Sequence, residues 1–200
     1  MKKSKKVTII SIITIAMIMG LLQIYHYCLN LSVELPEEMD SAVKVGLETM
    51  IEPNKYLPET YDDVEFVFSA SAHHTFGYTI DNDNIKVYGI FNLMKFDEEC
   101  IKAYRDNKTQ IGEIFHSNFW SGGYFLAYLK RDEQGKIVPE KIWTQYSIDD
   151  STLDTLKKFP IKTWPFILIG NPNKYDEIHV KEMQQQLHDY VYDNSIKSRK

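Results

Sequence analysis

The stretch Thr75–Phe96, "TFGYTIDNDNIKVYGIFNLMKF", predicts a β-hairpin. Apolar and polar residues alternate on both sides of its centre, as in strands that bury one face. Asp81–Asn84 is expected to form the turn, because Asp and Asn tolerate positive φ and hydrogen-bond to their own backbone. One face of the first strand is predicted to carry Phe76, Tyr78 and Ile80. The core face of the second strand is predicted to carry Ile85, Val87, Phe91 and Leu93.

A second alternating run, "VEFVFSASA", precedes the hairpin and predicts another strand. Its expected inward face is Phe66, Phe68, Ala70 and Ala72. The adjacent residues His73 and His74 follow and are interpreted as the junction between two strands. On one continuous strand their side chains would leave on opposite faces, so that one metal ion could not reach both. The alternative is a metal site in a loop, with His116 or Asp81 as a third ligand.

Three helices are expected around these strands. The first begins at Asp40 and places Val43, Leu47 and Met50 at helical spacing. A short helix begins at Asp97, which is a suitable capping residue. The longest is expected over Tyr175–Asn194, with an apolar stripe made of Val180, Met183, Leu187 and Val191.

Further elements complete the predicted sheet. Residues 122–146 are predicted to form a second hairpin that turns at "DEQG", Asp132–Gly135. A brief helix is expected from Ser151 to Phe159. The continuous apolar run "WPFILI", Trp164–Ile169, has the length of a strand and is predicted to lie inside the sheet, buried on both faces.

The order of elements predicts an α+β fold, with an N-terminal transmembrane helix followed by one domain that has a mostly antiparallel sheet and several helices. The expected organisation is a basic N-terminus at residues 1–6, a membrane anchor at 7–27, a connector at 28–36, the α+β domain at 37–194 and a short basic tail at 195–200.

The membrane anchor is predicted from an uncharged run, Val7–Tyr25, whose 19 residues would span about 28 Å as a helix. Four lysines precede it, and by the positive-inside rule they place the N-terminus in the cytoplasm and the remaining chain outside. A cleaved signal peptide is the main alternative. Its apolar region would be shorter, and small residues would mark the cleavage site, where this chain has the bulky "QIYHYCLN".

Composition narrows the classes of partner. The chain is 44% apolar and 26% charged, which is typical of a globular protein. All four ionised residues before Glu34 are lysines, so the chain beyond them is strongly acidic and is not expected to bind nucleic acid.

The two cysteines, Cys28 and Cys100, are too few for a disulfide framework, and no cofactor is expected. Abundant Lys, Ile, Asn and Tyr suit an AT-rich bacterial genome.

The densest aromatic stretch is Phe115–Tyr128, "FHSNFWSGGYFLAY". Its aromatic rings cannot all point inward. On the strand expected to begin near Gly123, Tyr124 and Tyr128 take one face and Phe125 the other, so one set is expected to meet solvent or a neighbouring helix. Trp and Tyr often anchor interfaces because they bury a large area and keep a polar tip. The candidate binding residues are therefore Phe119, Trp120, Tyr124 and Tyr128. The alternative is that helices cover both faces of the sheet and every ring belongs to the core.

These observations favour a single-pass envelope protein with a non-catalytic binding or accessory domain. Its expected partners are the membrane, through the N-terminal helix, and another envelope protein. The alternative function is a membrane-anchored hydrolase with a histidine-based site, for which the candidates are His73, His74 and His116.

Overall fold

The computed structural model describes residues 2–29, 32–52, 64–106, 119–145, 152–169 and 172–193. The chain divides into two compact units. The sheet unit consists of Ser32–Ser151 and Pro172–Lys200, and the helical unit consists of Met1–Leu31 and Thr152–Asn171. The segment 152–171, which the sequence assigned to a single domain, therefore groups with the N-terminal helix.

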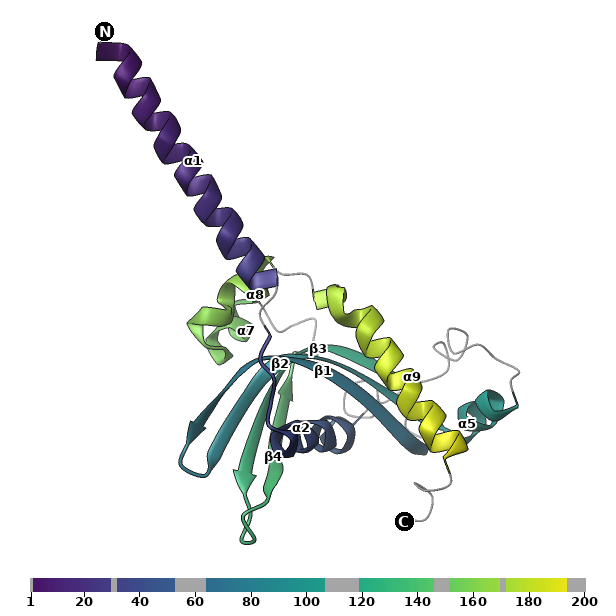
Figure 1. The fold of residues 1–200 in the computed structure, drawn as a ribbon. Coiled ribbons are helices and arrows are strands. Elements are labelled where there is room, and N and C mark those ends of the chain that lie inside the picture. Colours follow the sequence, from purple (N-terminus) through teal and green to yellow (C-terminus); the bar gives the residue numbers. More distant parts are fainter. Residues whose placement is uncertain are drawn as a thin grey trace. The chain divides into compact units, whose positions relative to one another are not determined.

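The sheet unit is built on four antiparallel strands that follow one another in chain order (Figure 1). They are β1 Phe66–Asp81, β2 Asn84–Asp97, β3 Phe119–Arg131 and β4 Ile137–Thr144. The predicted α+β class with an antiparallel sheet is confirmed, and so are both hairpins. Asn82 in the first turn has a φ of 52°, which is the conformation that Asn tolerates well.

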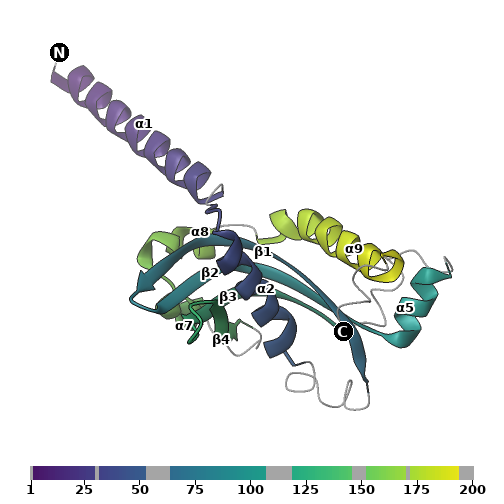
Figure 2. The same cartoon turned by 60° about the horizontal axis from the view of Figure 1, so that its bottom comes forward.

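Helices lie on both sides of this sheet. Helix α2, Glu37–Met50, crosses one face and contacts all four strands (Figure 2). Helix α9, Asp176–Tyr192, packs on the other face against β1 and β2. Helix α5, Glu98–Arg105, follows β2 and is capped by the Asp97 side chain, which accepts a hydrogen bond from the Cys100 amide at 2.8 Å.

Each helix seals its own apolar core. The core under α2 includes Val43, Leu47, Ile85, Val87, Phe91, Leu93 and Phe125. The core under α9 includes Ala70, Ala72, Met94, Phe96, Cys100, Met183, Leu187 and Val191. The predicted core face of the second hairpin strand and the predicted stripe of the last helix are thus buried, although Val180 is only partly so.

Strand β1 corrects two expectations. It runs without interruption through His73 and His74, so the histidines do not mark a junction between two strands. Its pairing with β2 shifts between Phe66 and Phe68 and again between Thr75 and Gly77. Each bulge adds one residue and reverses which face the following side chains use. Phe66 therefore packs on the α2 core and Phe68 on the α9 core, instead of sharing one face.

The outer edge of β1 is covered by side chain and backbone groups. The Gln186 side chain on α9 accepts from the Ser71 amide at 3.2 Å and donates to the Ser71 carbonyl at 2.8 Å. Further along, the Val33 amide donates to the Thr75 carbonyl at 2.9 Å. These contacts satisfy edge groups that would otherwise be open to pairing with another chain.

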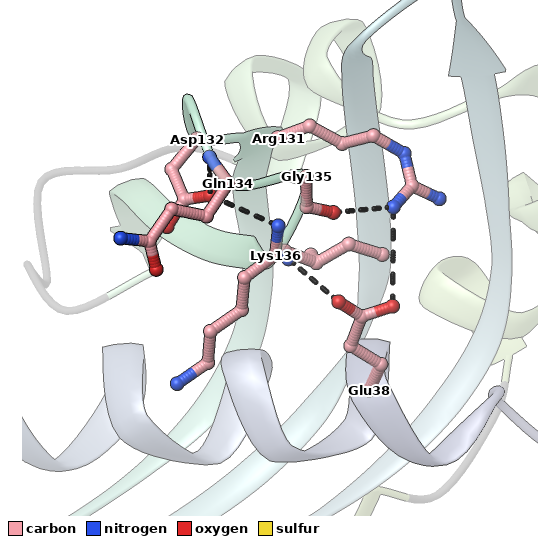
Figure 3. Close-up of polar contacts among 7 residues, drawn as sticks. Glu38, Arg131, Asp132, Gln134, Gly135 and Lys136 are labelled. Carbon is pink, nitrogen blue, oxygen red and sulfur yellow. Dashed lines mark hydrogen bonds and ion pairs between the residues drawn. The ribbon is translucent and has the colours of Figure 1, made fainter.

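Glu38 ties the second hairpin to α2 (Figure 3). Its Oε1 accepts a hydrogen bond of 2.8 Å from the amide of Ile137, and its Oε2 lies 3.9 Å from the guanidinium of Arg131. Arg131 also donates to the Gly135 carbonyl at 2.8 Å, and the Asp132 carboxylate accepts from the Lys136 amide inside the turn. The hairpin is thereby fixed against the start of the helix.

The helical unit comprises α1 Lys2–Leu29, α7 Thr152–Lys158, η1 Ile161–Thr163 and α8 Trp164–Ile169. Helix α8 contacts α1, α7 and η1. Within the part of the chain that the structure describes, no helix combines the length and the apolar character needed to cross a membrane.

The predicted strand Trp164–Ile169 is wrong, because these residues form helix α8. A short apolar run does not distinguish a buried strand from a helix. Pro165 fits the first turn of a helix, where no amide donor is required. The indole of Trp164 donates to the Phe159 carbonyl at 3.0 Å, which links the helix to the preceding turn.

The Glu38 contact generates the first prediction. Replacing Glu38 with Ala should lower the free energy of unfolding by about 1–3 kcal/mol, because the amide of the buried residue Ile137 loses its acceptor. Glu38→Gln should cost less than about 1 kcal/mol, since the amide oxygen still accepts and only the weak ion pair is lost. Urea unfolding measures both, with Glu37→Ala as the exposed neighbouring control. If Glu38→Ala and Glu38→Gln lowered the unfolding free energy equally, the hydrogen bond from the Ile137 amide would not be the stabilising contact.

Candidate functional site

A cavity of about 360 Å³ opens on the α9 face of the sheet, beside β3. Its volume lies within the range of small-molecule sites in proteins. The residues that define its chemistry are Asn92 from β2, Trp120, Gly122 and Tyr124 from β3, Gln145 after β4, and Asp176 at the start of α9.

The cavity exists because β3 has no side chain at its centre. Gly122 pairs directly with Asn92 across the sheet. A Cβ atom on Gly122 would lie only 2.7 Å from Oδ1 of Asn92, so a larger residue would collide with the cavity floor. The Asn92 amide group in turn donates to Oδ1 of Asp176 at 3.1 Å, which fixes the carboxylate at the mouth.

The walls of the cavity are aromatic. Trp120 keeps 50% of its surface exposed, whereas Tyr124 is buried. Burial raises the pKa of the Tyr124 phenol to about 12, so the hydroxyl stays protonated near neutral pH. The Gln145 amide donates to the Tyr124 carbonyl at 3.0 Å and holds the chain after β4 against this wall. The site therefore combines an aromatic surface, amide groups and one carboxylate.

An aromatic and histidine cluster borders this site. His74 pairs with Ile90, which lines the cavity, and its ring stacks on Tyr175 with 3.9 Å between centroids. The ring of His179 also lies near Tyr175, with 6.1 Å between centroids, and His179 is 3% exposed. Among the described residues, Nδ1 of His179 has no hydrogen-bond partner. Burial, reinforced by His74 and His73, lowers the pKa of His179 to about 4.

The proposed metal ligands are not brought together. His73 faces α2, where its Nε2 lies 3.2 Å from Oδ1 of Asp40, while His74 stacks on Tyr175. The hydrogen bond from His73 lowers the pKa of Asp40, against the opposing effect of burial. Both histidines border a separate hollow of about 480 Å³ at the edge of β1. His116 lies outside the described residues, which contain no group of three or more His, Cys, Asp or Glu placed to hold a metal ion.

The four candidate binding residues fall into different environments. Trp120 and Tyr124 line the cavity together. Phe119 points to the opposite face, where it is buried and meets Phe66 edge-on at 6.4 Å between centroids. Tyr128 lies further along β3, with the ammonium of Lys86 5.6 Å from its ring centroid.

The sequence reasoning missed Asn92, Asp176, Gln145 and His179. Asn92 was visible as a polar residue inside an apolar strand, and His179 stands four residues before Met183 on the same helical stripe. Neither of these two sequence features indicates which residues Asn92 and His179 meet in the fold.

Comparisons with protein-family models, with curated proteins and with solved structures found no match for this chain. The functional conclusion therefore depends on the geometry of the site itself.

The opposite environments of Phe119 and Trp120 give a second prediction. Phe119→Ala should cost about 3–5 kcal/mol of unfolding free energy, because it empties a packed core position. Trp120→Ala should cost less than about 1 kcal/mol, since half of the side chain is already in water. Thermal and urea unfolding of the two variants provide the comparison. A larger loss for Trp120→Ala than for Phe119→Ala would reverse the assignment of faces.

A third prediction concerns pH. His179 stays neutral in the folded protein down to about pH 4, whereas in the unfolded chain it binds a proton near pH 6.5. Between these values the unfolded state holds more protons, so stability should fall as the pH drops from about 6.5 to about 4, by about 3 kcal/mol in total. His179→Leu, which cannot titrate, should lose this part of the pH dependence. If the unfolding free energies of the parent and of His179→Leu depended on pH in the same way, the lowered pKa of His179 would be refuted.

Proposed function

We propose that this protein is a single-pass membrane protein whose sheet unit lies outside the membrane and binds a partner without catalysing a reaction. The observation that carries the binding role is the half-exposed indole of Trp120 at the mouth of a cavity that also presents the Asp176 carboxylate. The ligand that fits this site best is a cationic group, the side chain of a lysine or arginine on an envelope protein.

Support for the anchor comes from α1. The helix contains the uncharged run Val7–Tyr25, and four lysines precede that run. Large aliphatic side chains are exposed along the helix, among them Ile12, Ile15, Ile18, Leu21 and Leu22. A helix with such a surface is stable where lipid covers it. The preceding lysines favour a cytoplasmic N-terminus.

Support for a cationic ligand comes from the chemistry of the cavity. The face of a tryptophan ring attracts ammonium and guanidinium groups, and a nearby carboxylate adds a charge contact. Asp176 is the only charged residue among the described residues that line the cavity. Tyr124, held protonated by burial, can supply a neutral hydroxyl. The acidic charge of the chain beyond its N-terminus favours the approach of a basic partner.

Two observations favour binding over hydrolysis. The described lining of the Trp120 cavity contains no serine, cysteine, histidine or lysine that could act as nucleophile or base. At the other hollow, His73 is oriented by Asp40, as a general base requires, but its described contacts are with Asp40 and Phe125. Ser32 and Thr75 line the same hollow, but the buried Thr75 hydroxyl has no hydrogen-bond partner among the described residues, so that it is not paired with a base. The histidine-based hydrolase is therefore the weaker proposal.

The cationic site is tested with small probes. N-acetyl-lysine methylamide and N-acetyl-arginine methylamide are titrated into the full chain, and the indole N–H signal of Trp120, assigned with Trp120→Phe, is followed by NMR. Saturable shifts are expected, with a dissociation constant of about 1–10 mM for a single side chain. Asp176→Asn keeps an oxygen for Asn92 but loses the charge, and it should weaken binding about threefold to tenfold.

Two controls make the test specific. N-acetyl-norleucine methylamide matches lysine in length without the charge and should give no saturable shift. Asp83→Asn removes an exposed carboxylate in the β1–β2 turn and should leave binding unchanged. Equal binding of the norleucine probe, or an unaltered constant in Asp176→Asn, would rule out a cationic ligand.

A further inference from the structure

Among the described residues of the helical unit, three large aliphatic side chains outside α1 are exposed. Leu153 on α7 is 67% exposed, Ile161 on η1 is 75% exposed and Leu168 on α8 is 57% exposed. A concentration of exposed apolar side chains in one small unit is typical of a surface that meets another apolar phase.

Lysines accompany these apolar residues. Lys157 follows Leu153 by one helical turn, and Lys162 is the residue after Ile161. Residues 152–169 contain three lysines and one acidic residue, Asp154, whereas the chain beyond the N-terminal lysines is predominantly acidic. Apolar side chains next to flexible cationic ones are the combination with which interfacial helices bind anionic lipid.

Helix α8 also contacts α1, and it lies beside the C-terminal end of that helix (Figure 1). In a spanning helix this end would lie at the outer membrane–water interface. The contact therefore places the apolar helix α8 at the depth where aromatic and aliphatic side chains enter the headgroup layer.

We propose that α7, η1 and α8 rest on the outer surface of the bilayer, with Leu153, Ile161 and Leu168 inserted below the headgroups and the lysines facing anionic phosphates. This inference rests on the proposed membrane anchor. The occupant of the surface is lipid, because the lysines match its charge and the contact with α1 sets its position.

The experiment measures lipid contact at single positions of the full chain. Leu153→Cys, Ile161→Cys and Leu168→Cys are each made in a Cys28→Ser, Cys100→Ala background and labelled with an environment-sensitive fluorophore. The proteins are placed in nanodiscs of equal parts phosphatidylglycerol and phosphatidylcholine, with and without spin-labelled lipid as quencher. Ile80→Cys in the β1–β2 hairpin is the matched control, since Ile80 is 57% exposed. Ile15→Cys reports the anchor separately.

The three labels should be quenched by spin-labelled lipid several-fold more than the label at Ile80, and replacing Lys157, Lys158 and Lys162 with Gln should reduce this difference. Quenching no greater than at Ile80 overturns the inference, whatever the label at Ile15 shows. Protection from aqueous iodide without lipid quenching would indicate a protein neighbour, such as a second copy, and overturns it too. Absence of lipid quenching at Ile15 would instead refute the anchor.

Discussion

The rest of the sheet unit depends on one constraint: strand β2 must be covered on both faces. Every residue from Val87 to Phe96 is buried, and successive side chains of a strand point to opposite sides. An apolar strand with two buried faces is stable only between two layers. Helix α2 covers one face across all four strands, and α9 covers the other face over β1 and β2. Polar contacts then fix the position of α2: His73 with Asp40 near its start, and Lys95, which donates to the Glu48 carbonyl at 2.9 Å near its end.

The candidate site follows from where α9 packs. The helix contacts β1 and β2, and its first residue, Asp176, reaches the sheet beside β3. Gly122 leaves the floor open at that point, and Asn92 uses its side-chain amide to hold Asp176. The polar residue in the middle of β2 is thus satisfied by the helix that covers it, as a buried amide requires. In the same arrangement, half of the Trp120 surface stays exposed.

Sequence reasoning found part of this site and could not have found the rest. It named Trp120 and Tyr124 as binding candidates because both lie in the densest aromatic stretch, and these two residues do line the cavity together. It also grouped them with Phe119, which faces the opposite core, and with Tyr128, which lies beside Lys86. Asn92 and Asp176 are separated by 84 positions in the chain, so no local pattern relates them. His73 and His74 are the opposite case: they are adjacent in sequence, but their side chains leave β1 on opposite faces, His73 toward Asp40 of α2 and His74 toward Tyr175.

The sequence by itself determined the hairpins, the antiparallel α+β class, the cap at Asp97 and the buried stripe of the last helix, because turn chemistry and apolar periodicity are local properties. Only the tertiary structure decided the faces of β1, since two bulges each shift the alternation by one residue. It also decided that Trp164–Ile169 is a helix, because an apolar run of this length is compatible with either structure until its neighbours are placed. The cavity itself required both the missing side chain of Gly122 and the end of α9, which meet only after the chain has folded.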